Sequence, residues 1–256
     1  METTQGIDVS LTGRVAMVTG GRRGLGYTIS VGLARAGASL AVVSMSESAP
    51  ELRKALTEIG AELLYLPADL ADAGQRDGLV DRVVDRFGQI DILVNNAGCQ
   101  LLRPLMDFPL AEWERELAVM LTAPFDLSRQ AARHMMAAGG GKIVNIASVA
   151  SYQAARNVVA YVAAKHGLVG LTKSLCAELA AHHINVNAIA PGLFKTDMTQ
   201  HIFDQPGRAQ ELAGRIPAGR FGDPDDLVGT LLFLCSSASS HIHGQVIAVD
   251  GGWMAR

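Results

Sequence analysis

The feature that most constrains this chain is a regular alternation of two kinds of segment. Short apolar runs rich in β-branched residues alternate with longer stretches in which apolar residues recur every three or four positions. This alternation is typical of βαβ units and predicts a parallel sheet. The expected strands are Val15–Thr19, Leu40–Ser44, Leu63–Pro67, Ile90–Asn95, Lys142–Ser148, Ile184–Ile189 and Val246–Val249. The expected helices are Leu25–Ala36, Pro50–Ile59, Gln75–Phe87, Ala111–Ala138, Val158–Ala181 and Asp225–Ser236.

Several expected strands are apolar throughout, which is typical of a sheet covered by helices on both faces. No linker, repeat or low-complexity tract divides the 256 residues. We therefore expect one doubly wound (Rossmann) α/β domain over residues 1–256, with a parallel seven-stranded sheet and right-handed crossovers. The least regular region, Gly192–Gly222, is predicted to leave the sheet as an excursion over a substrate site, with a plain packing flap as the alternative.

Composition narrows the class of protein. The chain is 49% hydrophobic with a formal net charge of −3, which does not indicate a nucleic-acid partner. No stretch reaches the roughly 18–20 uninterrupted apolar residues of a membrane-spanning helix, and the first ten residues lack the apolar core of a secretory signal. Cys99, Cys176 and Cys235 have no CxxC spacing, so neither a disulfide framework nor a metal site is expected. We expect a soluble, cytoplasmic protein.

A glycine-rich turn directly follows the first expected strand and precedes a helix. Glycine accepts positive φ and lets backbone N–H groups approach a pyrophosphate, whose charge the positive end of the next helix favours. In this context the pattern predicts a dinucleotide site and not an unliganded turn. The residues assigned to it are Thr19, Gly20, Arg22, Arg23, Gly24, Leu25 and Gly26.

The end of the second expected strand bears on the choice between NAD and NADP. A carboxylate there binds the ribose 2′-hydroxyl and repels a 2′-phosphate, but Ser44 and Met45 occupy the place. Arg22 and Arg23 offer charge to a 2′-phosphate, whereas Glu47 is near enough to reach a ribose, so we predict NAD(P) with a slight lean to NADP(H). Further cofactor residues are expected at the carboxyl ends of later strands, with Asp69 as acceptor for the adenine amino group; they are Asp69, Leu70, Asn95, Ala97 and Gly98.

Ser148, Tyr161 and Lys165 carry the clearest chemistry. In a helix, Tyr161 and Lys165 lie four residues apart on one face. A free tyrosine, with a pKa near ~10, is a poor base at neutral pH, but a nearby ammonium favours the phenolate. Lys165 is therefore expected to lower the pKa of Tyr161, while Ser148 holds the substrate oxygen. Beside a nicotinamide, these residues predict reversible oxidation of a secondary alcohol, in which Tyr161 takes the hydroxyl proton as the hydride leaves.

Together these motifs resemble the classical short-chain dehydrogenase/reductase family over essentially the whole chain. The matching features are the glycine-rich turn, Asp69, the Asn95–Gly98 segment, the Ser148, Tyr161 and Lys165 set, and the Pro191-Gly192 pair with Thr196. The resemblance implies that Pro191, Gly192 and Thr196 contact the nicotinamide carboxamide and the pyrophosphate. It also implies a homotetramer.

One position departs from the family pattern. Where the family usually has an asparagine that helps to connect the lysine to solvent, this chain has Met120, and no asparagine occurs between Gly98 and Asn145. A thioether cannot donate a hydrogen bond and accepts one only weakly. The substitution puts proton relay in doubt and leaves open a second class of function, a catalytically weakened cofactor-binding sensor or partner subunit.

Within the family, the chain is most similar to dehydrogenases of sugar acids, the 2-dehydro-3-deoxygluconate 5-dehydrogenase and gluconate 5-dehydrogenase-like group. The similar stretches include Gly141–Ser148, Ile184–Gly192, Ile216–Arg220 and Asp250–Arg256. The resemblance favours a sugar acid or polyol as substrate, with a 3-oxoacyl thioester reductase as the alternative. The candidate substrate residues are Arg103, Gln153 and Arg156.

Overall fold

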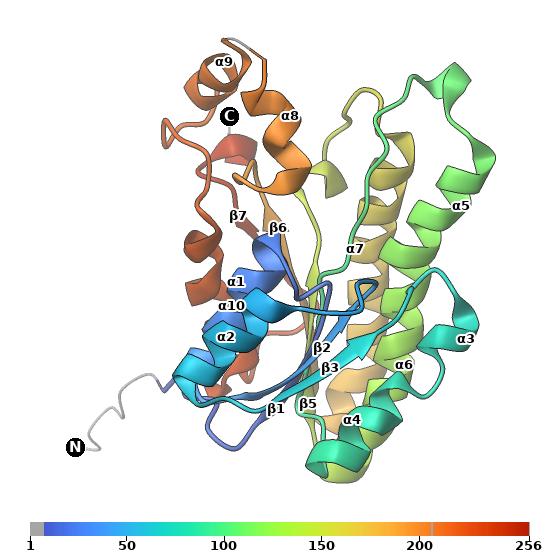
Figure 1. Ribbon diagram of the computed structural model, residues 1–256, viewed down its shortest axis with the longest axis vertical. Coiled ribbons are helices and arrows are strands. Elements are labelled where there is room, and N and C mark those ends of the chain that lie inside the picture. Colours follow the sequence, from blue (N-terminus) through green and yellow to red (C-terminus); the bar gives the residue numbers. More distant parts are fainter. Residues whose placement is uncertain (1–7, 206, 256) are drawn as a thin grey trace.

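A computed structural model describes residues 8–205 and 207–255, and these residues contain one parallel seven-stranded sheet (Figure 1). The strand order is β3-β2-β1-β4-β5-β6-β7. This order confirms the expected doubly wound α/β fold, because β1 and β4 lie side by side where the winding reverses direction. The strands are β1 (Val15–Thr19), β2 (Ser39–Ser44), β3 (Leu63–Pro67), β4 (Ile92–Asn95), β5 (Gly141–Ile146), β6 (Ile184–Pro191) and β7 (Val246–Val249).

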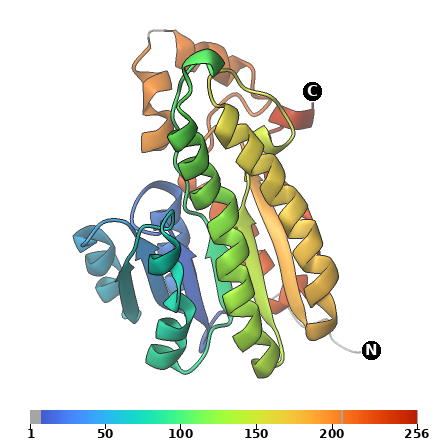
Figure 2. The ribbon, with the colours of Figure 1, turned by 90° about the vertical axis from the view of Figure 1, so that its right-hand side faces the viewer.

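Helices cover both faces of the sheet (Figures 1 and 2). Residues of β1 alternate between the two cores: Ala16 and Val18 pack in one, Val15 and Met17 in the other. The first core lies under α1, α2 and α10, and the second under α4, α6 and α7. The α-helices are α1 (Gly24–Arg35), α2 (Pro50–Ile59), α3 (Ala73–Arg76), α4 (Leu79–Phe87), α5 (Leu110–Leu117), α6 (Ala123–Ala138), α7 (Val159–Leu179), α8 (Gln200–Phe203), α9 (Arg208–Gly214) and α10 (Val228–Cys235).

Several boundaries differ from those expected. The helix predicted over 75–87 is two helices, because Gly78 adopts a left-handed φ of 66° between α3 and α4. The long helix predicted over 111–138 is continuous but contains a π-helical segment at Ala118–Thr122, which joins α5 to α6. β5 ends at Ile146, so Ser148 lies beyond the strand and not at its end.

The excursion at 192–222 contains α8, α9 and a short 3₁₀ helix, Asp197–Thr199, and lies beyond the carboxyl end of the sheet (Figure 1). A parallel bridge between Phe194 and Gly222 closes its base. The rings of Phe203 and Phe221 pack with centroids 4.9 Å apart. Among the helices of the described residues, none is long and apolar enough to cross a membrane.

Candidate active site

A cavity of about 650 Å³ opens at the carboxyl ends of the strands. Its walls come from the turn after β1, the ends of β2 to β6 and the start of the excursion. The structure brings most predicted site residues to this cavity: Gly20, Arg22, Arg23, Gly24, Leu25, Gly26, Ser44, Asp69, Leu70, Ala97, Gly98, Ser148, Tyr161, Lys165, Pro191, Gly192 and Thr196.

Two predicted cofactor residues, Thr19 and Asn95, lie beneath the cavity wall and do not line it. The Thr19 hydroxyl accepts hydrogen bonds from the backbone N–H groups of Asn96 and Ala97, both at 3.0 Å. The Asn95 amide donates to the Asn145 carbonyl oxygen at 2.8 Å. The Thr19 side chain therefore holds the segment after β4 in place beside the turn after β1. The Asn95 side chain instead joins the end of β4 to β5 and, through Ser128, to α6.

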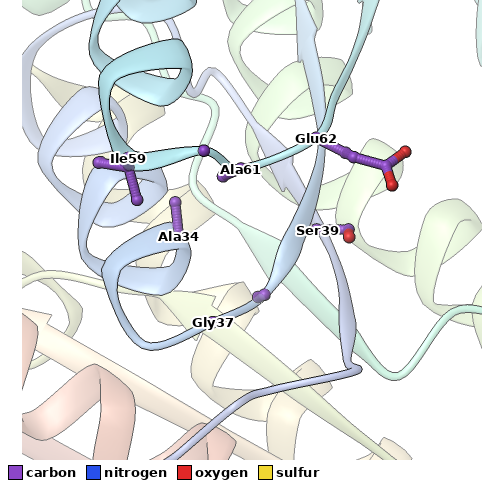
Figure 3. A pocket seen from close by; sticks show the side chains of 8 residues that line it. Ala34, Gly37, Ser39, Ile59, Ala61 and Glu62 are labelled. Carbon is purple, nitrogen blue, oxygen red and sulfur yellow. The ribbon is translucent and has the colours of Figure 1, made fainter.

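A second hollow, of about 210 Å³, lies at the amino end of the sheet, where Ser39 begins β2 and Glu62 precedes β3 (Figure 3). Figure 3 shows that small side chains such as Ala34 and Ala61 line much of it. The Glu62 carboxylate is paired with Arg86 at 2.7 Å. This hollow offers no set of convergent polar groups, so we assign the site to the larger cavity.

The glycine-rich turn requires glycine on steric grounds. Gly20 has a φ of 66°, and a Cβ there would lie 2.9 Å from the Ala97 Cα. A Cβ on Gly26 would overlap the carbonyl oxygen of Gly20. The turn therefore packs tightly against the segment after β4, and α1 begins at Gly24 with its amino end facing the cavity. A pyrophosphate fits this cradle, since unpaired N–H groups and the positive helix end face the same space.

A bidentate ion pair between Asp69 and Arg115 forms the wall at the ends of β2 and β3. Arg115 Nη1 lies 3.0 Å from Asp69 Oδ2, and Nη2 lies 3.3 Å from Oδ1. Hydrogen bonds from Arg115 and from the Ala71 N–H hold the pKa of Asp69 below its usual value, although burial opposes them. No sequence motif indicated Arg115, because it reaches the site from α5, 46 residues after Asp69.

The three predicted catalytic residues converge on the cavity. Ser148 caps a short 3₁₀ helix, accepts a hydrogen bond from the Ala150 N–H at 3.1 Å and is hydrogen-bonded to the Tyr161 phenol. Lys165 is buried on α7 and donates from Nζ to the Ile146 carbonyl oxygen at 2.6 Å. Its Nζ lies 5.6 Å from the centre of the Tyr161 ring. The end of β5 thus anchors Lys165 through the Ile146 carbonyl, and Ser148, two residues further on, holds the Tyr161 phenol.

The pKa of Tyr161 differs from the expectation that Lys165 lowers it. It is raised above the usual tyrosine value, and not lowered, because burial disfavours the phenolate and the charge of Glu116 adds to this effect. The hydrogen bond from Ser148 acts in the opposite direction. Burial also lowers the pKa of Lys165 to about 8, so the lysine loses its proton and its charge in the slightly alkaline range.

Met120 lies in the π-helical segment, fully buried in a small cluster with Ala164, Cys99 and Tyr161. The structure therefore places a thioether beside the tyrosine helix. One turn earlier, Glu116 is 1% exposed. Its Oε1 accepts a hydrogen bond from the Leu101 N–H at 2.5 Å, while its Oε2 has no hydrogen-bond partner among the residues that the structure describes. Burial raises the pKa of Glu116, and its position in an apolar helix face gave no signal in the sequence.

The candidate substrate residues lie outside the set that lines the cavity. Arg103, Gln153 and Arg156 are exposed. The Gln153 side-chain oxygen accepts a hydrogen bond from Trp253 Nε1 at 2.8 Å, which ties the carboxyl-terminal segment to the loop after Ser148. The Arg103 N–H donates to the Asn157 carbonyl oxygen at 2.8 Å, so the two loops that carry Arg103 and Arg156 lie side by side.

Comparison with known proteins identifies the family. Residues 20–254 match a family model described as enoyl-(acyl carrier protein) reductase. The chain is 33% identical to a short-chain type dehydrogenase/reductase from Mycobacterium marinum, with a TM-score of 0.91 and coverage of 97% of this chain and 98% of that one. The chain belongs to the short-chain dehydrogenase/reductase family. It is accordingly an oxidoreductase that acts on a secondary alcohol or the matching ketone.

Two relatives within this short-chain dehydrogenase/reductase family are named for sugar acids. The chain is 44% identical to 2-dehydro-3-deoxy-D-gluconate 5-dehydrogenase of Escherichia coli (strain K12), over 96% of this chain and 98% of the relative. It is 38% identical to gluconate 5-dehydrogenase from Burkholderia cenocepacia J2315, crystallised with NADP and tartrate, with a TM-score of 0.92 and coverage of 97% and 98%. These similarities confirm the resemblance inferred from the motifs.

Proposed function

We propose that this protein is an NADP(H)-dependent dehydrogenase that interconverts a secondary hydroxyl and a ketone on a sugar acid of the gluconate type. The observation that carries the proposal is that Ser148, Tyr161 and Lys165 open onto the same cavity as the glycine-rich turn. The names of the relatives support the substrate class, and the NADP bound to the Burkholderia enzyme supports the cofactor.

Each catalytic group has one task in this proposal. When bound, the nicotinamide supplies the hydride acceptor for oxidation and the hydride donor for reduction. The Ser148 hydroxyl holds the substrate oxygen, and the Tyr161 phenolate takes the hydroxyl proton in oxidation and returns it in reduction. The Lys165 ammonium, anchored on the Ile146 carbonyl, favours the phenolate electrostatically. This support is present below the Lys165 pKa of about 8 and is lost as the pH rises through it.

We assign the remaining residues to the cofactor. The turn from Gly20 to Gly26 would hold the pyrophosphate, and Asp69 and Leu70 would bound the adenine. Pro191, Gly192 and Thr196 would contact the nicotinamide carboxamide and the pyrophosphate, since they line the same cavity as the turn. Thr196 lies beside the turn, because a Cβ on Gly24 would be 4.0 Å from the Thr196 Cβ. Arg103, Gln153 and Arg156 remain candidates for the substrate carboxylate.

A turnover panel tests the proposal. Purified protein is assayed with NADP⁺ and NAD⁺ against gluconate-type sugar acids and polyols, and with NADPH and NADH against keto sugar acids and 3-oxoacyl thioesters, by the absorbance of the reduced nicotinamide. We expect turnover of sugar acids with a preference for NADP(H). Turnover of acyl thioesters alone would establish the reductase alternative, and tight cofactor binding with no turnover would favour the sensor. NADH binding at least about tenfold tighter than NADPH, or about 1.4 kcal/mol, would reverse the cofactor assignment.

We propose that Met120 slows the enzyme and does not abolish its activity, because Ser148, Tyr161 and Lys165 are all in place. Met120→Asn is expected to speed the proton-linked step by up to about tenfold, the effect of about 1.4 kcal/mol on the barrier. It is also expected to lower stability by about 1–3 kcal/mol, since an amide enters an apolar cluster. The measurement is kcat with its solvent deuterium isotope effect, and Met120→Leu is the control. Equal rates for the two variants would refute this role.

Glu116 provides a test of the pH dependence. Its negative charge raises the pKa of Tyr161, so Glu116→Gln is expected to lower that pKa. Because oxidation requires the phenolate, the rise of kcat/KM for oxidation with pH should move to lower pH in this variant. Glu114, exposed on the same helix, gives the matched control Glu114→Gln. A profile that coincides with that of the wild type would show that the Glu116 charge does not act on Tyr161.

We also propose a cytoplasmic homotetramer built from single domains of residues 1–256. The three cysteines are all free, which fits a reducing compartment. Exposed apolar side chains on α5 and α6, including Leu110, Phe125 and Met136, offer surface for contacts between copies. Light scattering coupled to size-exclusion chromatography measures the assembly directly.

A further inference from the structure

The end of β2 carries no charged side chain next to the cavity. Ser44, Met45 and Ser46 occupy it, and all three line the cavity. In this fold the same strand end meets the adenosine ribose, and a nearby arginine accommodates the 2′-phosphate in enzymes that use NADP. A preference for NADP(H) therefore requires a cation from another element.

Arg115 brings a cation to this place from α5. Its Nη2 lies 3.5 Å from the Met45 Sδ, and both Nη atoms bind Asp69 at the end of β3. The Arg115 side chain is 38% exposed and lines the cavity. The guanidinium is thus fixed between the ends of β2 and β3 and remains open to a ligand.

The hydrogen-bond inventory of Arg115 leaves donors free for an anion. The pair with Asp69 uses one N–H on each Nη atom, and the other N–H groups of the fork remain. Within the described part of the chain, the other hydrogen-bond contact of Nη2 is the Met45 thioether, which is a weak acceptor. A phosphate oxygen forms a much stronger, charge-assisted hydrogen bond with a guanidinium.

The other arginines of the cavity are placed differently. Arg23 lies at the glycine-rich turn and pairs with Asp197 of the excursion at 3.5 Å. Arg22 belongs to the same turn, on the side of the cavity assigned to the pyrophosphate. In residues 8–205 and 207–255, Arg115 is the arginine with a hydrogen-bond contact to Met45 at the end of β2.

We infer that Arg115 recognises the 2′-phosphate of NADP(H), in the role that a basic side chain on β2 would otherwise fill. Asp69 holds the guanidinium in position through the bidentate pair. Asp69 Oδ2 accepts one hydrogen bond, from Arg115, which leaves a lone pair for the adenine amino group. Arg115 therefore determines the specificity for the cofactor. This inference rests on the proposed use of NADP(H).

Calorimetric titration with 2′,5′-ADP and 5′-ADP tests this role without any turnover. Arg115→Met should weaken binding of 2′,5′-ADP by about 10- to 100-fold, the expected loss for a charge-assisted pair, and change that of 5′-ADP by less than about twofold. Arg115→Lys, which keeps the charge but loses the fork, should fall between the wild type and Arg115→Met. Arg129→Met is the control, since Arg129 is an exposed arginine of α6 paired with Asp126, outside the cavity lining.

The outcomes separate this inference from the proposed function. Equal weakening of both nucleotides in Arg115→Met, with Arg129→Met unchanged, would show that Arg115 only supports the adenine wall, and unchanged binding of both would remove it from the site. Either result leaves the NADP(H) preference standing. A wild-type protein that binds 5′-ADP as tightly as 2′,5′-ADP would overturn the preference itself and the role of Arg115 with it.

Discussion

Replacing Tyr161 with phenylalanine is expected to lower kcat for alcohol oxidation by about 10²- to 10⁴-fold, the usual contribution of a positioned general base. The hydroxyl is the group on α7 that is hydrogen-bonded to Ser148, and its removal leaves the substrate proton without an acceptor in that position. The ring itself should stay in place, because the phenyl group keeps its contact with the cluster around Met120. The expected effect is therefore on kcat, with little change in stability.

Tyr27→Phe gives the matched control for this prediction. Tyr27 lies on α1, packs against the first core and does not line the cavity. The two variants are compared in steady-state turnover, with NADPH binding measured by fluorescence. The mechanism fails if Tyr161→Phe turns over at the wild-type rate.

Replacing Gly26 with alanine is expected to damage both stability and cofactor binding. A Cβ at this position would overlap the Gly20 carbonyl oxygen and lie 2.6 Å from Asn96 Nδ2. That amide donates to the Thr19 carbonyl oxygen at 2.9 Å, so the new methyl group also pushes on the contact that joins the turn to the segment after β4. Because backbone atoms must move, we expect a loss of about 1–3 kcal/mol or more in the free energy of unfolding.

Thermal unfolding and NADPH titration measure these two effects. For a chain of this size, Tm should fall by about 2–4 °C for each kcal/mol lost. Gly229→Ala on α10 is the control, because a Cβ there meets no atom of the described residues within 4 Å and alanine at this exposed helical position should add about 0.5–1 kcal/mol of stability. A Gly26→Ala protein that melts with the wild type and still binds NADPH would contradict the steric argument.

Much of the fold could be predicted because buried parallel strands have a distinct sequence pattern. The bounds of β1, β3, β7 and α2 agree with those expected. Two boundary predictions were wrong where the backbone conformation of one or two residues ends a helix or a strand. Gly78 interrupts a segment whose apolar spacing is helical on both sides. Ser148 follows an apolar strand that stops two residues earlier, where the chain turns into a 3₁₀ helix.

The site was predictable to the extent that its residues belong to local motifs. The glycine-rich turn and the Tyr161–Lys165 spacing are visible within a few residues of sequence. Arg115 and Glu116 are not, because their importance comes from contacts with distant segments: Arg115 meets Met45 across 70 positions. The direction of the Tyr161 pKa shift also could not be predicted from the sequence, since it depends on how deeply the phenol is buried and on the charge of Glu116.

The π-helical segment Ala118–Thr122 determines how far the side chains of α5 are rotated about the helix axis relative to those of α6. A π turn holds one residue more than an α turn, so the deletion of one residue there would restore a regular α-helix. Since each α-helical residue turns the chain by about 100°, everything before the deletion would rotate by that angle about the helix axis relative to α6. Arg115 would leave Asp69, and the Glu116 carboxylate would leave the Leu101 N–H. One inserted residue thus keeps Arg115 directed at Asp69 and Glu116 directed at the Leu101 N–H.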